Sequence, residues 1–273
     1  METLPTIDLC GHEVTRLICG GNPFSGVSHQ TGELSREMTE YYTTANLLAA
    51  LDECVKNGIN TIQNRGDRHI SRMYLEHRLA GGPLQWIAQT ASEMANLRAN
   101  IDRILSFKAM AIYHHGTHVD NMWHEGRIDE IADIIKYIKD QGVPAGMCSH
   151  IPEVIEYAEE KGFETDFYMC CFYNLSRKQR DYVVTSSKSG EEKYLPEDPP
   201  AMAKVIRQVP KPCLAFKILG AGRNCATPQD VKRAFQFAFE NIKPTDAVVV
   251  GHFQKRRNEI AENAAIVREL LGS

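Results

Sequence analysis

Short apolar runs alternate with helical patterns along the whole of this 273-residue chain, and no other feature limits its fold as strongly. The runs lack the in-and-out alternation of half-exposed strands, which is typical of parallel strands covered on both faces. Eight such pairs favour a closed barrel, with an open doubly wound sheet as the alternative, because pattern alone does not show closure. The expected strands are 16–20, 61–64, 85–90, 109–114, 144–149, 167–173, 214–219 and 247–251.

The predicted helices carry recognisable N-terminal signals. Ser149, Asp198 and Thr227 stand just before helical patterns, where a side-chain oxygen can accept backbone N–H bonds as an N-cap. The expected helices are 43–57, 70–79, 94–105, 128–141, 152–161, 200–208, 228–241 and 259–271.

Two long stretches without periodicity, 22–39 and 176–199, each follow a predicted strand. Connections of this length are usually functional loops or disordered segments. In a barrel of alternating strands and helices the carboxyl ends of the strands surround one mouth, so both stretches are predicted to be long loops there. Side chains at the strand ends are then the first place to look for chemistry.

The composition is that of a globular protein. With 43% hydrophobic residues and no linker-like stretch, residues 1–273 are expected to form a single domain. A net charge of −4 offers no basic surface for nucleic acid, and no run of about 18 apolar residues would span a membrane. The N-terminus lacks an apolar secretory segment, which favours a cytoplasmic protein. The expected partner is a small-molecule substrate. The sequence indicates no oligomeric state.

Histidines gather at the predicted strand ends. His115 follows the fourth strand, His150 the fifth and His252 the eighth, so the three imidazoles are predicted to meet at the mouth. Imidazoles around an open coordination position suit Zn, Mn, Fe or Ni, which would act as a Lewis acid on a carbonyl or hydroxyl group. The alternative is ordinary solvated or packed histidines, because ligands from different strands leave no spacing signature.

A lysine interrupts the seventh apolar run. Lys217 follows Phe216, and a charged group in a buried strand must be paired, neutralised or pointed at the mouth. It is either a salt-bridged structural lysine or a functional amine that acts as a base, an electrophile or an imine former. The residues that follow predict an anion site, since barrels often bind phosphate after their seventh and eighth strands; the alternative is a tight turn with a surface arginine. They are Gly220, Gly222 and Arg223.

Four segments, in chain order, resemble the aldo-keto reductase superfamily. They are 7–21, 50–60, 113–115 and 250–263, and together they extend over nearly the whole chain. The resemblance implies a (β/α)8 TIM barrel with a short N-terminal β-hairpin. It also implies NAD(P) bound across the mouth and an active site made of an aspartate, a tyrosine acid, a lysine and a histidine.

Most of that active site is missing from this chain. Gln63 or Asn64 stands where the family has its aspartate, and no tyrosine follows. Gln89 or Thr90 stands where the lysine is expected, so only the histidine persists, as His115. Reduction would then need an atypical acid, and general acid catalysis is worth about 10²–10⁴-fold.

The cofactor positions of the family are partly kept. Tyr173 and Asn174 resemble the aromatic ring and the amide that meet the nicotinamide, although a tyrosine there could equally pack in the wall. NADP-binding members place a basic residue three positions before a Glu-Asn pair. In this chain the asparagine of that pair is Asn263, and Glu259 stands at the position of the basic residue. A carboxylate repels the 2′-phosphate of NADP, but Arg256 lies close by and could supply the charge.

Three functional hypotheses follow. The first is an NAD(P)-linked oxidoreductase of the aldo-keto reductase type, acting on a small carbonyl or sugar-type substrate with an atypical acid. The second is a non-redox lyase, hydratase or isomerase acting on a keto-sugar or similar carbonyl compound, with or without a divalent metal. The third is a catalytically silent barrel that binds a ligand. The candidate catalytic residues are His115, Lys217, His252 and Gln63, and the candidate metal ligands are His115, His150 and His252.

Overall fold

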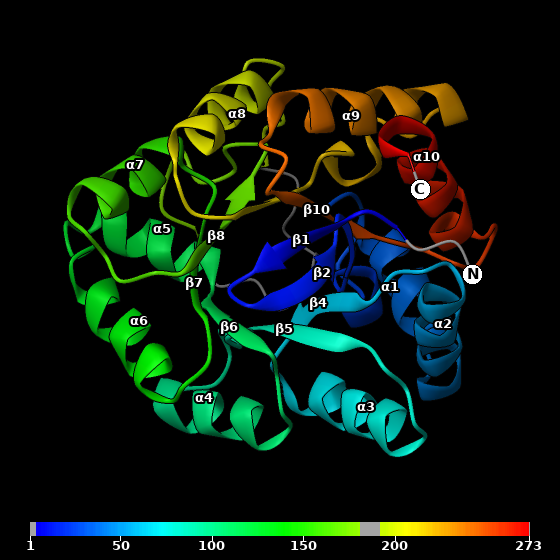
Figure 1. The fold of residues 1–273 in the computed structure, drawn as a ribbon, viewed down its shortest axis with the longest axis horizontal. Coiled ribbons are helices and arrows are strands. Elements are labelled where there is room, and N and C mark those ends of the chain that lie inside the picture. The colour runs from blue at the N-terminus through cyan, green and yellow to red at the C-terminus, as the bar shows by residue number, and fades with distance from the viewer. Residues whose placement is uncertain (1–3, 181–191, 273) are drawn as a thin grey trace.

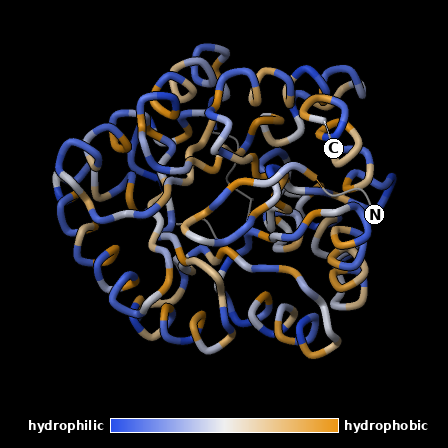
Figure 2. The backbone as a smooth tube through the Cα atoms, viewed as in Figure 1, coloured by the Kyte–Doolittle hydropathy of each residue, from blue (hydrophilic) through white to orange (hydrophobic). Residues whose placement is uncertain are grey.

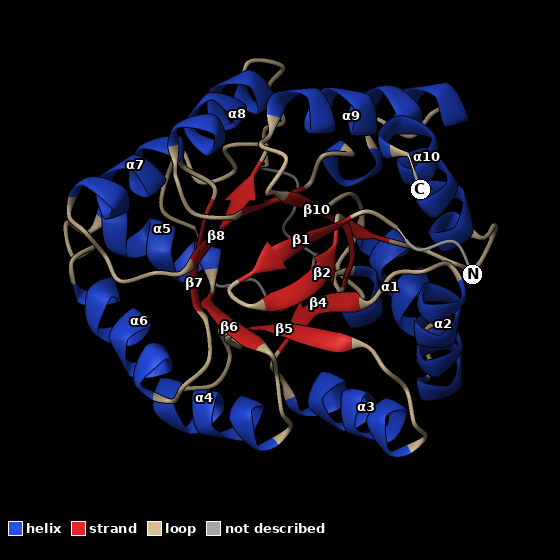
Figure 3. Ribbon diagram, in the orientation of Figure 1, coloured by secondary structure: helices blue, strands red, loops and turns tan. Residues whose placement is uncertain are grey.

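Eight parallel strands close into a barrel inside a ring of helices in the computed structural model, which describes residues 4–180 and 192–272 (Figures 1 and 3). The last strand pairs with the first as well as with its predecessor, since Val248 lies opposite both Leu17 and Ala215. This pairing confirms the closed barrel and excludes the open sheet. The barrel strands are β3 (Leu17–Gly20), β4 (Thr61–Arg65), β5 (Gln85–Gln89), β6 (Ala111–His114), β7 (Ala145–Ser149), β8 (Phe167–Cys171), β9 (Cys213–Phe216) and β10 (Ala247–Gly251).

Two apolar layers explain why the strands read as unbroken apolar runs. On β5, Trp86 belongs to the layer between barrel and helices, whereas Ile87 belongs to the barrel interior. On β8, Tyr168 and Phe167 divide in the same way. A strand buried on both faces needs apolar residues at successive positions, not at alternate ones.

An antiparallel hairpin closes the amino-terminal end of the barrel. Leu9 and Val14 pack into the barrel interior. Side-chain amides at the starts of β4 and β5, from Asn60 and Gln85, both donate to the carbonyl oxygen of Glu13. Figure 1 shows the hairpin across the centre of the ring, so the carboxyl ends of the strands, on the opposite side, are left as the mouth. The hairpin strands are β1 (Thr6–Leu9) and β2 (His12–Thr15).

The helices pack their apolar stripes against the outside of the barrel (Figure 2). They are α1 (Gly32–Tyr41), α2 (Thr44–Lys56), α3 (Arg68–Leu79), α4 (Leu97–Ser106), α5 (Gly116–His124), α6 (Glu130–Asp140), α7 (Pro152–Glu160), α8 (Asp198–Gln208), α9 (Pro228–Asn241) and α10 (Glu259–Leu271). Thr227 caps α9 as its sequence predicts. The other two N-cap predictions are wrong: Ile151 caps α7 in place of Ser149, and Asp198 is already the first residue of α8. None of the helices in the described ranges is long and apolar enough to cross a membrane.

The stretch predicted as a long loop at 22–39 holds the 3₁₀ helix η1 (Pro23–Ser25) and most of α1. Only Ser35 and Met38 of α1 are buried, so its apolar stripe is too thin to show a helical period. The stretch 176–199 ends in the first residues of α8, and its positions 181–191 lie outside the described residues. The sequence pattern also does not predict α5, which begins directly after the fourth barrel strand and its histidines.

Candidate functional site

A cleft of about 430 Å³ opens at the mouth of the barrel. Its walls come from the loops after β3, β9 and β10, the first, seventh and eighth strands of the barrel, and from the start of α10. Barrels frequently bind phosphate-bearing ligands after the last two of these strands. The structure brings five of the predicted site residues together as lining of this cleft: Gln63, Lys217, Gly222, Arg256 and Asn263. The predicted residues His115 and His150 are not among the residues that line it.

Bare backbone forms one wall of the cleft. Gly20 lies opposite Gly251 in the β3–β10 pair, and a Cβ on Gly20 would stand 3.1 Å from the amide nitrogen of Gly251. Gly21 packs so closely on Asn64 that any Cβ would overlap the amide of that side chain. Glycine is needed at Gly20 because two backbone segments approach one another, and at Gly21 because the side chain of Asn64 fills the space of a Cβ.

His115 lies directly after β6 and caps α5. Its Nδ1 accepts the backbone N–H of Thr117 at 3.2 Å. A neutral imidazole whose Nδ1 accepts carries its proton on Nε2. Burial, together with the charge of Arg65, lowers the pKa of His115 well below its usual value, so the ring is neutral near pH 7. His115 is therefore a hydrogen-bond donor that can polarise a carbonyl oxygen.

A buried carboxylate fixes the tautomer of His150, which is the opposite of the tautomer of His115. Nδ1 of His150 lies 2.6 Å from Oδ2 of Asp120, a fully buried residue of α5. The hydroxyl of Ser149 and the backbone N–H of His150 donate to the same carboxylate. Because Asp120 only accepts, the neutral ring keeps its proton on Nδ1, and Nε2, which has no partner among the described residues, offers a lone pair. Burial lowers the pKa of His150, although Asp120 opposes the shift, so His150 is a candidate base.

Gln63 reaches the mouth from β4 and donates from Nε2 to the hydroxyl of Tyr113 at 2.6 Å. An amide does not titrate, so Gln63 holds its neighbour in place and moves no proton. Burial raises the pKa of Tyr113 well above its usual value, which makes this hydroxyl a weak acid. The pair therefore does not replace the tyrosine acid that the resemblance implies.

Lys217 lines the cleft beside His29, which is not among the predicted site residues. Its Nζ lies 3.4 Å from Nδ1 of His29. The same Nδ1 lies 3.1 Å from both carboxylate oxygens of Glu192, which also pairs with Arg180. Lys217 and His29 have φ angles of 60° and 55°, in the left-handed region that non-glycine residues rarely adopt. Backbone strain of this kind gathers at functional sites.

His252 does not lie at the mouth, which corrects its prediction as a catalytic residue and a metal ligand. Its ring is fully buried, and Nδ1 lies 3.5 Å from Sγ of Cys19, which packs with side chains of α2 outside the barrel. Side chains alternate along an extended chain, so Gly251 faces the cleft and His252 faces the helices. Within the described residues no group of His, Cys, Asp or Glu side chains is arranged to hold a metal ion. The predicted site of His115, His150 and His252 is thus not formed.

The predicted anion site after β9 is a closed turn. It contains the 3₁₀ helix η3 (Gly220–Gly222), in which the N–H groups of both glycines bond to carbonyl oxygens of the same loop. Arg223 lies 3.7 Å over the ring of Tyr194 and donates to the carbonyl oxygen of His29. These three predicted residues therefore hold the loop, which is the tight-turn alternative, and only the second glycine also lines the cleft.

Tyr173 and Asn174 lie beside this turn and are not among the residues that line the cleft. The hydroxyl of Tyr173 accepts from Asn224 at 3.1 Å, and its ring packs on Tyr194. Oδ1 of Asn174 accepts the backbone N–H of Ser176. Their contact with a nicotinamide stays a prediction, and in the structure they stabilise the loops.

Charges at the α10 end of the cleft are balanced. Lys255 and Arg256 both pair with Glu37 of α1, and Arg257 pairs with two glutamates of α10. Three cations thus meet three carboxylates, which leaves no excess positive charge for the extra phosphate of NADP. Asn263 lines the cleft beside them.

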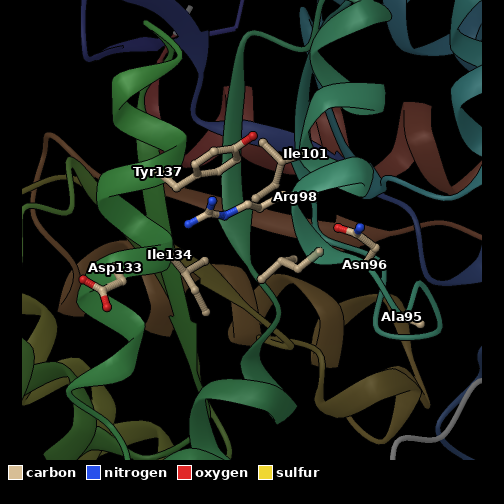
Figure 4. Close-up of a pocket in the computed structure, with 8 residues that line it drawn as sticks. Ala95, Asn96, Arg98, Ile101, Asp133, Ile134 and Tyr137 are labelled. Atoms are coloured by element: carbon tan, nitrogen blue, oxygen red, sulfur yellow. The ribbon is translucent and has the colours of Figure 1, made fainter.

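A second hollow, of about 360 Å³, lies on the outer wall between α4 and α6 (Figure 4). The guanidinium of Arg98 lies there 4.8 Å from the ring centre of Tyr137. The residues that line it include no histidine, cysteine or lysine. The histidines and the lysine that the sequence predicts as site residues lie on the barrel side instead, away from this hollow.

Three residues that organise the mouth were not predicted from the sequence: Asp120, His29 and Glu192. Asp120 lies on α5, which the pattern does not show, and meets a histidine from the next strand. His29 and Glu192 lie in irregular segments, and nothing local to either marks it. Asp120 could be predicted only after α5 is recognised, because Asp120 lies in the second turn of that helix, which faces the end of the strand.

No protein-family model and no curated protein sequence matches this chain. Solved structures match it over nearly its full length. An apo form of Gox0644 has a TM-score of 0.61 at 10% identity and covers 97% of this chain and 88% of that one. The holo form of aldo-keto reductase AKR11C1 from Bacillus halodurans has a TM-score of 0.60 at 12% identity and covers 98% and 90%.

The same barrel is also similar to enzymes of other kinds. A truncated 3-deoxy-D-arabino-heptulosonate 7-phosphate synthase from Thermotoga maritima has a TM-score of 0.55 at 12% identity and covers 98% of this chain and 90% of that one. The structural neighbours therefore include aldo-keto reductases, but at these identities the likeness is one of fold. Function has to be argued from the site.

Proposed function

We propose that this protein is an NAD(P)-linked oxidoreductase that interconverts a small alcohol and its carbonyl compound, such as a sugar derivative. One observation carries the proposal: a single cleft is lined by Gln63 and Lys217 at the barrel mouth and by Arg256 and Asn263 at the start of α10. A dinucleotide is long, with its reactive ring at one end and its adenosine at the other. A cleft that runs from the barrel mouth to the start of α10 suits a ligand of this length.

The residues along the cleft fit such a cofactor. Gly20, Gly21 and Gly251 leave bare backbone against which a flat ring and a pyrophosphate can pack. Arg256 is largely exposed, so it can reach a ligand in spite of its ion pair with Glu37. Because the charges at this end cancel, the cleft should prefer NAD to NADP.

A bound nicotinamide would supply the hydride chemistry, and the protein handles the proton. His115 donates from Nε2 to the substrate oxygen and polarises its bond to carbon. When the alcohol is oxidised, Nε2 of His150 takes the hydroxyl proton, and Asp120 stabilises the imidazolium that forms. In the opposite direction His150 returns this proton to the oxygen. The Asp120–His150 dyad thus does the work of the missing tyrosine.

Two of the similar structures support the choice of cofactor. AKR11C1 is in its holo form, and a mutant of Gox0644 in complex with NADPH has a TM-score of 0.59 to this chain at 12% identity. The cofactor is carried over from these proteins by analogy of fold.

Binding of NADH and NADPH, followed by the fluorescence of the reduced nicotinamide, tests the proposal. NADH should bind with a micromolar Kd, and Arg256→Ala should weaken binding severalfold. The matched control Arg98→Ala, in the outer groove between α4 and α6, should leave it unchanged. Binding no tighter than millimolar for both cofactors would exclude the redox function.

The second candidate is a non-redox lyase, hydratase or isomerase acting on a keto-sugar or similar carbonyl compound. The complementary histidines favour it, since His115 presents a donor and His150 a lone pair. Such a pair can hold a carbonyl oxygen and remove a proton from the neighbouring carbon without a redox cofactor. Exchange of solvent deuterium into dihydroxyacetone, seen by NMR and lost in His150→Gln, would support this function; no exchange with a panel of hydroxyketones and keto-sugars would argue against it.

A further inference from the structure

Lys217 takes no part in the steps above, yet it lines the cleft. It forms no ion pair with a carboxylate of the described residues, whereas Arg180 close by is paired with Glu192. Its hydrogen-bonding neighbour is Nδ1 of His29, at 3.4 Å. A partly buried lysine that makes no direct ion pair gains little from keeping its charge, and burial favours loss of its proton.

The tautomer of His29 decides what that neighbour offers. Nε2 lies 3.1 Å from Nδ2 of Asn22, an amide group that only donates, so Nε2 is an acceptor. Burial, the largest cause, lowers the pKa of His29, so near pH 7 the ring is neutral and its proton is on Nδ1. This N–H group donates to the carboxylate of Glu192, which lies 3.1 Å away.

An ammonium group on Lys217 would therefore face an N–H group, which offers it no acceptor. A neutral amine has a lone pair and avoids this conflict. Burial also lowers the pKa of Lys217, although Glu192 opposes the shift. The hydrogen-bond donors and acceptors of His29, Glu192 and Lys217 therefore match best when the lysine is uncharged.

The backbone holds this amine in the cleft. Lys217 adopts a φ of 60° directly after β9, and its carbonyl oxygen accepts the N–H of Gly220 to close the turn. The neighbouring residues Phe216 and Ile218 line the same cleft. The amine is therefore held beside the His29–Glu192 pair in a residue that lines the cleft, where a small ligand can reach it.

We propose that Lys217 is a nucleophilic amine that forms an imine with a small aldehyde or ketone bound in the cleft. Nζ attacks the carbonyl carbon, and the carbon–oxygen double bond opens to give a carbinolamine. The carbinolamine then loses its oxygen as water. Both hydrogens of the amine leave in that water molecule, so the step needs neither an oxidant nor a reductant.

The neutral histidines of the mouth can carry the proton between nitrogen and oxygen. His150 lies close enough to Lys217 for the charge of the lysine to act on its ring, so Nε2 of His150 is the proposed acceptor of this proton. Asp120 then stabilises the charged ring. The inference rests on the second candidate function and deepens it, since an imine makes a proton on the adjacent carbon easier to remove. It does not depend on dinucleotide binding.

Reductive trapping on the full chain tests the inference. The protein is incubated at pH 7 with glycolaldehyde or dihydroxyacetone and sodium cyanoborohydride, digested, and its lysines are followed by mass spectrometry. Lys217 should be labelled at least about tenfold faster than Lys211, because each unit by which a pKa falls makes the neutral amine tenfold more abundant. Lys211 is a matched internal control, since it is paired with Glu159.

The rate of labelling as a function of pH separates a reactive amine from a structural one. Labelling of Lys217 should reach its plateau at a lower pH than labelling of Lys211. Equal rates and equal pH profiles would mean an ordinary ammonium group and would overturn the inference. Because the comparison is made within the wild-type protein, it does not depend on a variant that folds, and it is read separately from NADH binding and from deuterium exchange.

Discussion

The carboxylate of Asp120 lies 2.6 Å from Nδ1 of His150, and both side chains are buried. The carboxylate also accepts from the hydroxyl of Ser149 and from a backbone N–H. A buried carboxylate held by three donors can serve the imidazole only as an acceptor. This relationship sets which nitrogen of His150 bears the proton and so which one can act as a base.

Asp120→Asn should reverse that arrangement. An asparagine can turn its NH2 group toward Nδ1 of His150, which moves the ring proton to Nε2 and removes the lone pair. Long-range ¹H–¹⁵N NMR of the imidazoles should show the Nδ1–H tautomer for the wild-type ring and the Nε2–H tautomer for the variant. Proton transfer at the site should slow by about 10²–10⁴-fold. An unchanged tautomer would show that Asp120 does not orient the ring.

Acid should destabilise the protein as the pH falls from 6.5 to 4. Burial lowers the pKa of His114 to about 3, from an ordinary value of 6.5 in the unfolded chain. Between these values the unfolded chain takes up a proton that the folded chain does not, so the stabilisation is complete above pH 6.5 and is lost as the pH falls. For His114 the free energy of unfolding should drop by up to about 3 kcal/mol at pH 4.

Urea unfolding at pH 7 and pH 4 measures this loss. His114→Asn keeps a polar group beside Thr90, which bonds to Nδ1 of the histidine, but takes up no proton in either state. The variant should therefore be less sensitive to pH than the wild type. His69→Asn, at an exposed position, should keep the wild-type dependence, and equal behaviour of the two variants would count against the buried neutral ring.

The alternation of apolar runs and helical patterns is enough to predict the barrel, because burial on both faces of each strand leaves that imprint on the sequence. Three elements, β10, α9 and α10, have the bounds that the pattern predicts. α1 was missed for the opposite reason: it buries only two side chains, so its sequence is nearly that of a solvated loop.

The site is harder to predict because its contacts join distant parts of the chain. Lys217 could be found because it breaks an apolar run, but its partner His29 lies 188 positions away. Asp120 is 30 positions from His150 and lies in an unpredicted helix. His252 was placed wrongly because the run before it is buried on both faces, so the pattern does not show which face the next residue takes.

Removing one carboxylate should change the preference for the cofactor. Glu37 neutralises both Lys255 and Arg256 at the α10 end of the cleft. Glu37→Gln should leave these cations free to bind the 2′-phosphate of NADPH, so the ratio of NADPH to NADH affinity should rise by a few-fold, the size expected for exposed charge pairs. Glu130→Gln breaks an exposed ion pair with Arg127 and should leave the ratio unchanged. Equal ratios in the wild type and in Glu37→Gln would place the adenosine elsewhere.

Gly21→Ala should disturb both the fold and the cleft, whereas Gly32→Ala should not. A Cβ on Gly21 would overlap the amide of Asn64, which is fully buried and whose polar atoms have no hydrogen-bond partner in the described residues. Relief requires movement of the backbone at β3 or of that side chain, and overpacking of this kind costs about 1–3 kcal/mol. Gly32 has open space around its Cβ position at the start of α1, so alanine fits there.

Urea unfolding of the Gly21→Ala and Gly32→Ala variants measures the difference in stability. Equal stability would show that this wall of the cleft rearranges without cost to accept the Cβ. NADH titration of the same samples should find weaker binding only for Gly21→Ala, because only that substitution displaces backbone that lines the cleft.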